Sequence, residues 1–314
     1  MIHGLQRISR RVLNRPQLIT PDGALAVLSA LAPRANIARV ALADEGGALV
    51  TLEAPEIAAR NEQARARADG REDRCFAFDP ETGIAYLPIE GELVHRYGHL
   101  DPCSGLTGYD GITVKVQEAA ADPAVRGILL DIDSPGGELY GCDGCAEAIY
   151  RARQAKPVWA IANELAASAA YWLASAADVL VVPRTGDAGS IGVVMMHADM
   201  SGAMDKAGIT VTLIHAGAHK VDGNPYQALP KDVQSRLQAE CEVARGLFVE
   251  SVARYRGRPA SAFEATEALV YMGEDAVTAG LADAVADFDE TYQEFARSLA
   301  AAGTAAGTPA SNSH

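Results

Sequence analysis

The stretch VRGILLDIDSPGG, residues 125–137, joins an apolar run to four turn-forming residues. Its first nine residues are mostly apolar over the length of one strand, which is typical of a strand buried on both faces of a parallel sheet. Ser134-Pro135-Gly136-Gly137 predicts that this strand ends there. The residues from Glu138 to Gln154 then predict a helix, so the stretch indicates one strand–turn–helix unit of an α/β fold.

The same alternation of strand and helix continues along the chain. Because short apolar strands alternate with helices, we expect largely parallel sheets covered by helices. Helices are predicted at 112–121, 166–177 and 232–257, and further strands at 86–89, 157–162, 179–182, 191–195 and 209–214.

The domain organisation follows from changes in composition. Residues 1–75 predict a separate N-terminal region, either a propeptide or a partner-binding segment. The main domain is predicted at 76–290, and residues 291–314 predict a helical end followed by a flexible tail of small and polar residues.

The bulk composition restricts the partners of the protein. Acidic residues outnumber basic ones 41 to 27, giving a formal net charge of -14, which disfavours nucleic acid and anionic membranes. The most apolar long stretch, residues 165–177, is too short to cross a bilayer, and the N-terminus lacks the apolar core of a secretory signal. We therefore expect a cytoplasmic protein without a membrane anchor.

The five cysteines do not form the pattern of a disulfide framework. Cys142 and Cys145 form a single CxxC pair, but the second half of a zinc site is missing from the sequence around them. We interpret both as structural thiols and expect neither a metal nor an organic cofactor.

Two glycines follow the strand predicted at 125–133. Gly136 and Gly137 would let the backbone approach a ligand and point N–H groups at it, as in an oxyanion hole built from the main chain. The alternative is an ordinary glycine-rich turn.

Ser168 lies within the small-residue run LAASAAYW, residues 165–172. Small neighbours would let a substrate approach its hydroxyl, and the N–H of Ala169 could donate to an oxyanion. The alternative is a buried serine at a close helix contact.

Lys220 follows the strand predicted at 209–214, in a loop of small residues. A lysine acts as a general base only where its surroundings lower its pKa toward neutrality. The alternatives are a solvated surface lysine, or a serine–histidine pair in which the adjacent His219 is the base.

Taken together, the three sites resemble the signal peptide peptidase A family of serine peptidases, and in particular its phage branch, the head maturation proteases of the protein C type. The resemblance rests on the order of the motifs, with 31 residues from Gly137 to Ser168 and 52 from Ser168 to Lys220. The segment 187–193 resembles the family's G-S-I-G-V stretch, and 271–283 resembles its closing motif. The likeness covers residues 83–290. Ala169 departs from the glycine that many members carry after the nucleophile, which puts the local backbone pose in question.

The resemblance implies a fold of the Clp-peptidase and crotonase type and a Ser168/Lys220 dyad. Ser168 would be the nucleophile and Lys220 the general base, oriented by Ser190, while Gly137 and Ala169 donate N–H groups to the oxyanion beside Gly136. It also implies a cyclic homo-oligomer that cleaves scaffold, capsid or its own termini during phage head maturation.

Three other functions are compatible with the sequence. The first is a cellular cytoplasmic peptidase of the same mechanism that degrades peptides. The second is a non-catalytic capsid-interior protein that binds scaffold. The third is a crotonase-type acyl-CoA enzyme, which would share the fold but would need neither Ser168 nor Lys220.

Overall fold

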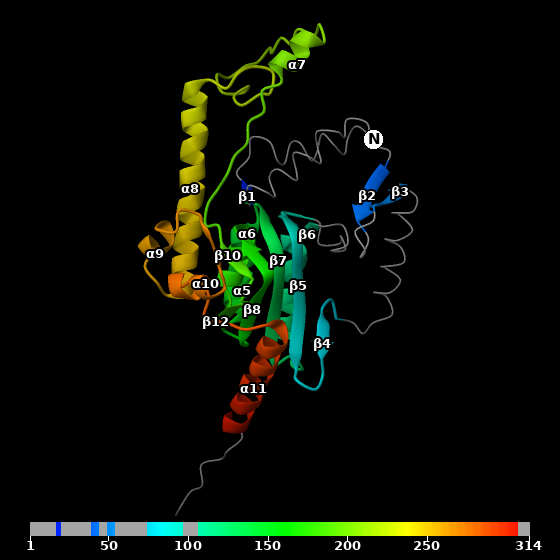
Figure 1. The fold of residues 1–314 in the computed structure, drawn as a ribbon, viewed down its shortest axis with the longest axis vertical. Helices are drawn as coiled ribbons and strands as arrows, with labels where there is room; N and C mark the ends of the chain where they lie inside the picture. Colours follow the sequence, from blue (N-terminus) through cyan, green and yellow to red (C-terminus); the bar gives the residue numbers. More distant parts are fainter. Residues whose placement is uncertain (1–16, 20–38, 44–48, 54–73, 97–105, 307–314) are drawn as a thin grey trace, which may run out of the picture.

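The computed structural model describes residues 17–19, 39–43, 49–53, 74–96 and 106–306 (Figure 1). Most of the predicted N-terminal region and the last eight residues of the predicted tail lie outside these ranges. Within them, β2 (Arg39–Ala43) and β3 (Leu49–Glu53) form a separate antiparallel pair.

The centre of the fold is one mixed sheet whose main path runs β11-β10-β8-β7-β5-β4. The inner strands β5, β7, β8 and β10 are parallel, and the outer strands β4 and β11 pair antiparallel. The predicted α/β class with a largely parallel sheet is therefore confirmed. The bounds are β4 (Ala77–Asp79), β5 (Ile84–Val94), β7 (Gly127–Glu138), β8 (Val158–Ala167), β10 (Asp187–Gly189) and β11 (Val270–Met272).

Four shorter strands lie off this path. β6 (Leu106–Gly108) continues beside β5, and β9 (Val179–Val182) runs parallel to β8 with β12 (Ala284–Val285) next to it. β1 (Gln17–Ile19) pairs antiparallel with the end of β7.

β7 is longer than the sequence predicts, because the Ser-Pro-Gly-Gly turn is part of the strand. A Cβ on Gly137 would lie 1.9 Å from the carbonyl oxygen of Leu93 on β5, so only glycine allows the two backbones to approach this closely. The strand therefore continues to Glu138, and the helix predicted to start there begins at Cys142.

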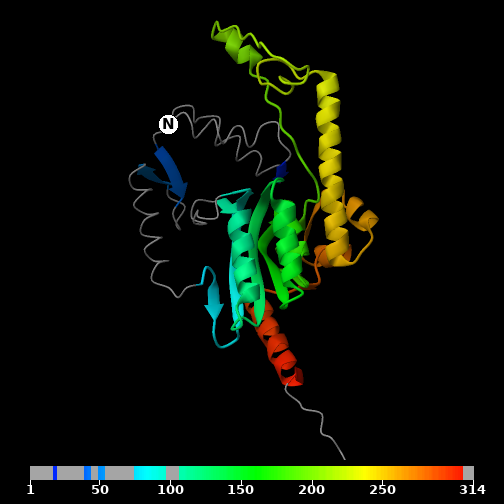
Figure 2. The same cartoon turned by 180° about the vertical axis from the view of Figure 1, so that it is seen from behind.

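Helices cover both faces of the sheet. α4 (Tyr109–Ala121), α5 (Cys142–Ala152) and α6 (Ala169–Ser175) cover one face, and α11 (Phe288–Ala306) crosses the other (Figures 1 and 2). Alternate residues of β7 face opposite ways: Leu130 joins the large core and Leu129 joins Phe295 of α11. Trp159 of β8 stacks on Phe295 with ring centroids 4.9 Å apart, which fixes α11 on its face.

α8 (Lys231–Arg256) packs its C-terminal half against α6 and extends beyond the sheet with its N-terminal half. Residues 192–230, here called the arm, run away from the sheet beside α8 and include the short helix α7 (Ser201–Lys206) (Figures 1 and 2). The strand predicted at 209–214 is wrong for this structure: the segment forms no ladder, and Ile209 and Ile214 are exposed. Two small helices, α9 (Ala260–Glu264) and α10 (Gly273–Ala279), complete the described fold beside α8 and β11.

Among the described residues, no helix is both long enough and apolar enough to span a bilayer.

Candidate active site

Three parallel strands bring Ser168, Ser190 and the two predicted glycines to one edge of the sheet. Ser134 of β7 pairs with Ala166 of β8, and Ala167 pairs with Gly189 of β10. Ser168 and Ser190 each directly follow the last of these paired residues. The carboxyl ends of neighbouring parallel strands meet at the same edge, so these two serines lie side by side.

Ser168 occupies a sharp strand-to-helix turn between β8 and α6. Its φ of 54° and ψ of -120° are unusual for a residue with a side chain, and such strain costs about 1–3 kcal/mol. Its N–H donates to the carbonyl of Gly189 at 2.8 Å, and its own carbonyl accepts from Trp172 at 3.0 Å, so the turn is fixed on both sides.

The Ser168 hydroxyl is buried and lacks a hydrogen-bond partner among the described residues. Leaving a buried hydroxyl unpaired costs about 1–3 kcal/mol, so an orphaned oxygen of this kind needs an explanation. A nucleophile that waits for a base and a substrate provides one.

Ala169 and Ala170 present no obstacle to this arrangement. Both belong to α6, all seven of whose residues are buried, and neither is among the residues with positive φ. The left-handed position falls on Ser168 itself, so the glycine that many relatives carry after the nucleophile is not required for this backbone pose.

The two glycines of β7 allow backbone arrangements that a residue with a side chain would disfavour. Gly136 has a φ of +108°, and its N–H donates to the Ser134 hydroxyl at 3.2 Å. Gly137 lies against β5, as described above. The alternative of an ordinary glycine-rich turn is wrong for this structure, because both glycines lie within β7 and pair with β5.

Ser190 is buried and also has a positive φ, of 58°. Its N–H donates to the Leu269 carbonyl at 2.9 Å, and its carbonyl accepts from Gly192 at 2.8 Å. The residues before β11 thus hold Ser190 beside Ser168.

Lys220 is not brought to this edge within a single copy of the chain. It is exposed in a turn of the arm, where its N–H donates to the Gly217 carbonyl. The turn is tied to α8 because Asp222 accepts from Arg236. Phe248, which stacks on Trp172 of α6, lies twelve residues further along α8, a rise of about 18 Å. The predicted Ser168/Lys220 contact is therefore absent from the described residues of one copy.

His219 is equally remote. Its Nδ1 lies 2.8 Å from a carboxylate oxygen of Asp222, and its side chain is exposed. It contacts the carboxylate that holds the turn to α8, so within one copy it does not act as a base for Ser168 either.

Two carboxyl groups that the sequence did not single out lie beside Gly136. Glu92 of β5 is in register with Gly136, and burial, followed by the nearby charge of Glu138, raises the pKa of Glu92 to about 7. Glu138 accepts from the N–H of His95 at 2.9 Å. Only the pairing of β5 with β7 reveals this pair, since residues 92 and 138 are far apart in sequence.

The two cysteines of the CxxC pair lie in the first turn of α5 and are buried. Burial raises the pKa of both thiols, that of Cys145 to about 12, so they stay protonated at neutral pH. The Cys142 Sγ lies 3.7 Å from the carbonyl of Ala169, so this thiol packs beneath the start of α6. In the part of the chain that the structure describes, no group of three or more metal-ligating side chains occurs.

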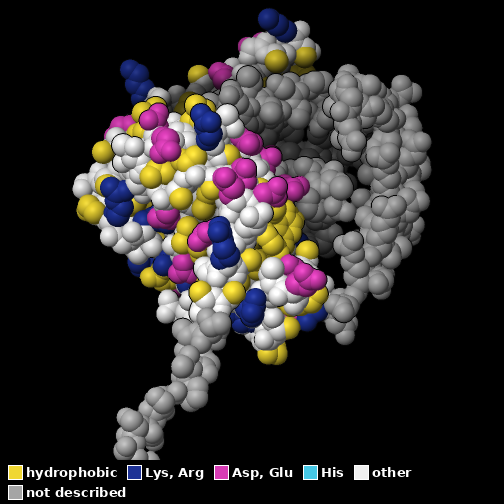
Figure 3. Space-filling model, turned by 60° about the horizontal axis from the view of Figure 1, so that its bottom comes forward, with side chains coloured by type: hydrophobic (Ala, Val, Ile, Leu, Met, Phe, Trp, Pro, Cys, Tyr) yellow, Lys and Arg dark blue, Asp and Glu magenta, His cyan; other side chains and the backbone are white. Residues whose placement is uncertain are grey.

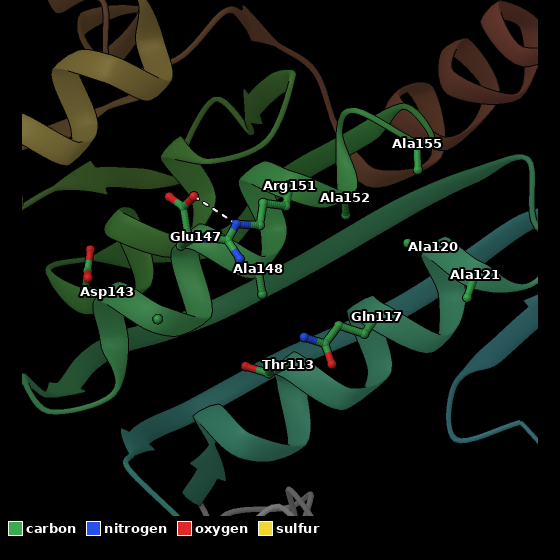
Figure 4. A pocket seen from close by; sticks show the side chains of 11 residues that line it. Thr113, Gln117, Ala120, Ala121, Asp143, Glu147, Ala148, Arg151, Ala152 and Ala155 are labelled. Carbon is green, nitrogen blue, oxygen red and sulfur yellow. Dashed lines mark hydrogen bonds and ion pairs between the residues drawn. The ribbon is translucent and has the colours of Figure 1, made fainter.

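A groove of about 590 Å³ lies between α4 and α5, away from this edge (Figure 4). Thr113 and Gln117 of α4 face Glu147 and Arg151 of α5 across it, and none of the serines described above lines it. Acidic and basic side chains are interspersed on the lower face of the molecule, and no continuous basic surface is visible there (Figure 3).

Comparison with known proteins shows the relationships of the chain. It is 42% identical over 299 residues to head-tail preconnector protein GP5 of Enterobacteria phage P21, covering 95% of this chain and 58% of that protein. It is 41% identical over 285 residues to capsid assembly protease C of Escherichia phage lambda, covering 90% of this chain and 63% of that protein. The chain thus spans about six-tenths of the length of these relatives.

Among solved structures, a ClpP1 variant from Listeria monocytogenes is 11% identical, with a TM-score of 0.40, covering 67% of this chain and 95% of that one.

The sequence profile of peptidase family S49 matches residues 151–302. This range includes the whole of β8, the whole of β10 and the arm. Residues 151–302, which carry Ser168, Ser190 and Lys220, are therefore similar to peptidase family S49, in agreement with the resemblance found in the sequence.

Proposed function

We propose that this chain is a serine endopeptidase that cleaves proteins of a phage capsid, with Ser168 as its nucleophile. The observation that carries the proposal is the Ser168 hydroxyl, which is buried on a strained turn where three strands end and has no hydrogen-bond partner among the described residues. The identity of 41% with a capsid assembly protease supports scaffold or capsid proteins, or the chain's own termini, as substrates. The site of action is then the host cytoplasm or the interior of the procapsid.

The reaction would proceed through an acyl-enzyme. The Ser168 Oγ attacks the scissile carbonyl carbon while a base takes its proton, and the N–H groups of Gly137 and Ala169 stabilise the oxyanion. The C–N bond then breaks as the base returns the proton to the leaving amine. Water next attacks the acyl ester and releases Ser168 with the second product.

Lys220 is the proposed base, and a neighbouring copy is its proposed source. In one copy the arm holds Lys220 away from Ser168 and presents it to solvent. The arm and the outer side of α8 also expose apolar side chains, with Ile214 at 96% and Val243 at 67% exposure. Such surfaces favour subunit contacts. A cyclic oligomer in which each arm reaches the next subunit would place Lys220 beside Ser168 and Ser190.

The test of the function is a pair of serine variants in α6 and its N-cap. Ser168→Ala is expected to abolish cleavage of co-expressed scaffold and capsid proteins, whereas Ser175→Ala, which removes a hydroxyl that donates to the Trp172 carbonyl, is expected to retain cleavage. Gel analysis of the products and labelling by a fluorophosphonate probe are the measurements. Cleavage by Ser168→Ala would refute the assignment. Absence of cleavage by the unmodified protein would favour the non-catalytic scaffold-binding alternative.

A further inference from the structure

The end of β7 has one side that no inner strand of the sheet occupies. On one side β5 stays paired to the end, with Glu92 opposite Gly136 and Leu93 opposite Gly137. On the other side β8 pairs only as far as Ser134 opposite Ala166 and then turns away into Ser168 and α6. The backbone of β7 beyond Ser134 is therefore open toward the position that β8 has vacated.

β1 occupies this position. Its three residues pair antiparallel with β7, with Gln17 opposite Glu138, Leu18 opposite Gly137 and Ile19 opposite Gly136. Because β5 holds the opposite side at the same residues, β1 lies on the side that β8 has left. Figures 1 and 2 both show β1 at the end of the sheet where α6 begins.

The register places β1 next to the nucleophile. If the pairing of Ser134 with Ala166 continued for two more residues, Gly136 would face Ser168. Ile19 faces Gly136 instead. A peptide backbone in this position therefore passes Ser168 at the level of the two glycines.

We infer that this edge of β7 binds an extended peptide through its backbone, and that β1 is its resident occupant, competing with the substrate. Peptides commonly bind proteins by adding a strand to an exposed sheet edge. A strand of three residues is weak by itself. Because β1 is part of the chain, it acts at an effective concentration on the order of mM, which suffices against a dilute substrate.

This inference rests on the proposed function, because it identifies what fills the proposed substrate position. It assigns residues 17–19 a specific task within the predicted N-terminal region: they hold the site closed until a longer or more concentrated peptide displaces them. The main chain of β1 pairs with the main chain of β7, so the strength of this binding depends on the N–H groups of β1.

The test is a pair of prolines in the full chain. In an antiparallel pair, alternate residues exchange hydrogen bonds with the partner strand, so one of the two neighbours Leu18 and Ile19 donates its N–H to β7. Proline has no N–H, so replacing both residues by proline removes that hydrogen bond whichever of the two makes it. The matched control, alanine at both positions, keeps the backbone groups. A second control places two prolines at Val40 and Ala41 in β2, which perturbs the N-terminal part of the chain without touching β1.

Two measurements separate this inference from the proposed function. For a fluorogenic peptide, Leu18→Pro/Ile19→Pro is expected to lower KM several-fold at unchanged kcat, since a site nine-tenths occupied raises apparent KM about tenfold. In the Ser168→Ala background, the same change is expected to speed amide hydrogen exchange at residues 136–138 by about tenfold, with both controls unchanged.

An unchanged KM in an active enzyme, or unchanged exchange at 136–138, would overturn the inference. Faster exchange together with absence of turnover in every variant would refute the proposed function and retain β1 as the occupant of this edge. Release of the segment before residue 20 by the active enzyme, with faster turnover after its release, would support the inference, because a displaced occupant would then be removed.

Discussion

Ser168 and Ser190 are both non-glycine residues with positive φ, and they follow neighbouring strands. Each is fixed by backbone hydrogen bonds from a different part of the chain, Ser168 through Gly189 and Ser190 through Leu269. Conformations of this kind cost about 1–3 kcal/mol each and persist only where the surroundings enforce them. Both serines are therefore held in these conformations by their surroundings.

At the same edge, Glu92 makes stability depend on pH. Its pKa is about 7 in the folded chain against an ordinary value of 4.5, so between these values the folded state holds a proton that the unfolded state has lost. Its contribution to stability is complete below pH 4.5 and is lost as the pH rises to 7. Glu92→Gln should abolish that loss, on the order of 1–2 kcal/mol after allowance for partial solvent screening.

The measurement is urea unfolding at several pH values between 4 and 8. Glu90→Gln is the control, because Glu90 lies on the same strand and is exposed. If Glu92→Gln and the unmodified protein showed the same pH dependence, the buried carboxyl would not be its source.

At the scale of elements, α6 depends on α8 for its position. The rings of Trp172 and Phe248 stack with centroids 4.5 Å apart and nearly parallel planes, and α6 begins directly after Ser168. Truncation of a buried phenylalanine removes both apolar burial and packing. Phe248→Ala should therefore lower the free energy of unfolding by about 3–5 kcal/mol and reduce kcat, because the start of α6 loses its support.

Leu247→Ala is the matched control, since the adjacent side chain is 55% exposed and its loss should change the unfolding free energy of one copy by less than about 0.5 kcal/mol. Thermal or urea unfolding and steady-state kinetics are the measurements. Equal destabilisation by both variants would contradict the assigned role of the α6–α8 contact.

At the scale of the whole molecule, the separation of Lys220 from Ser168 leads to a prediction about mixed oligomers. If the two residues of one site come from adjacent copies, Ser168→Ala and Lys220→Ala subunits are each inactive alone but complement one another. Random co-assembly would place an intact serine beside an intact lysine in about a quarter of the sites.

Co-expression of the two variants, followed by a peptidase assay and light scattering, is the measurement. Activity near a quarter of the unmodified level is expected. A mixture as inactive as its components, or a monomeric unmodified protein with full activity, would show that the arm folds back within its own chain.

The sequence predicted much of this arrangement, and the misses have physical causes. The apolar runs at 128–132 and 158–162 predicted buried parallel strands, because such strands need apolar residues on both faces. The three-residue β10, which positions Ser190, has no apolar run and exists because it pairs with β8. The continuation of β7 through Gly137 depends on the approach of Leu93, 44 residues earlier in the chain.

The position of Lys220 was beyond prediction for a different reason. Its spacing from Ser168 in the sequence resembles that of the family. Spacing alone does not determine whether the arm, residues 192–230, packs against its own chain or against another copy. The segment 209–214 has the composition of a strand, yet it has no ladder in one copy. Its β-branched residues remain exposed, which is consistent with pairing that depends on another copy.

The exposed arm has a consequence for timing. If the proposed dyad is divided between two copies, the rate of cleavage rises with more than the first power of protein concentration, and dilute, newly made chains leave the proteins around them intact. Enclosure of many copies in a small shell would raise their local concentration abruptly. Cleavage would then begin when the shell has gathered its contents, without any separate activating factor.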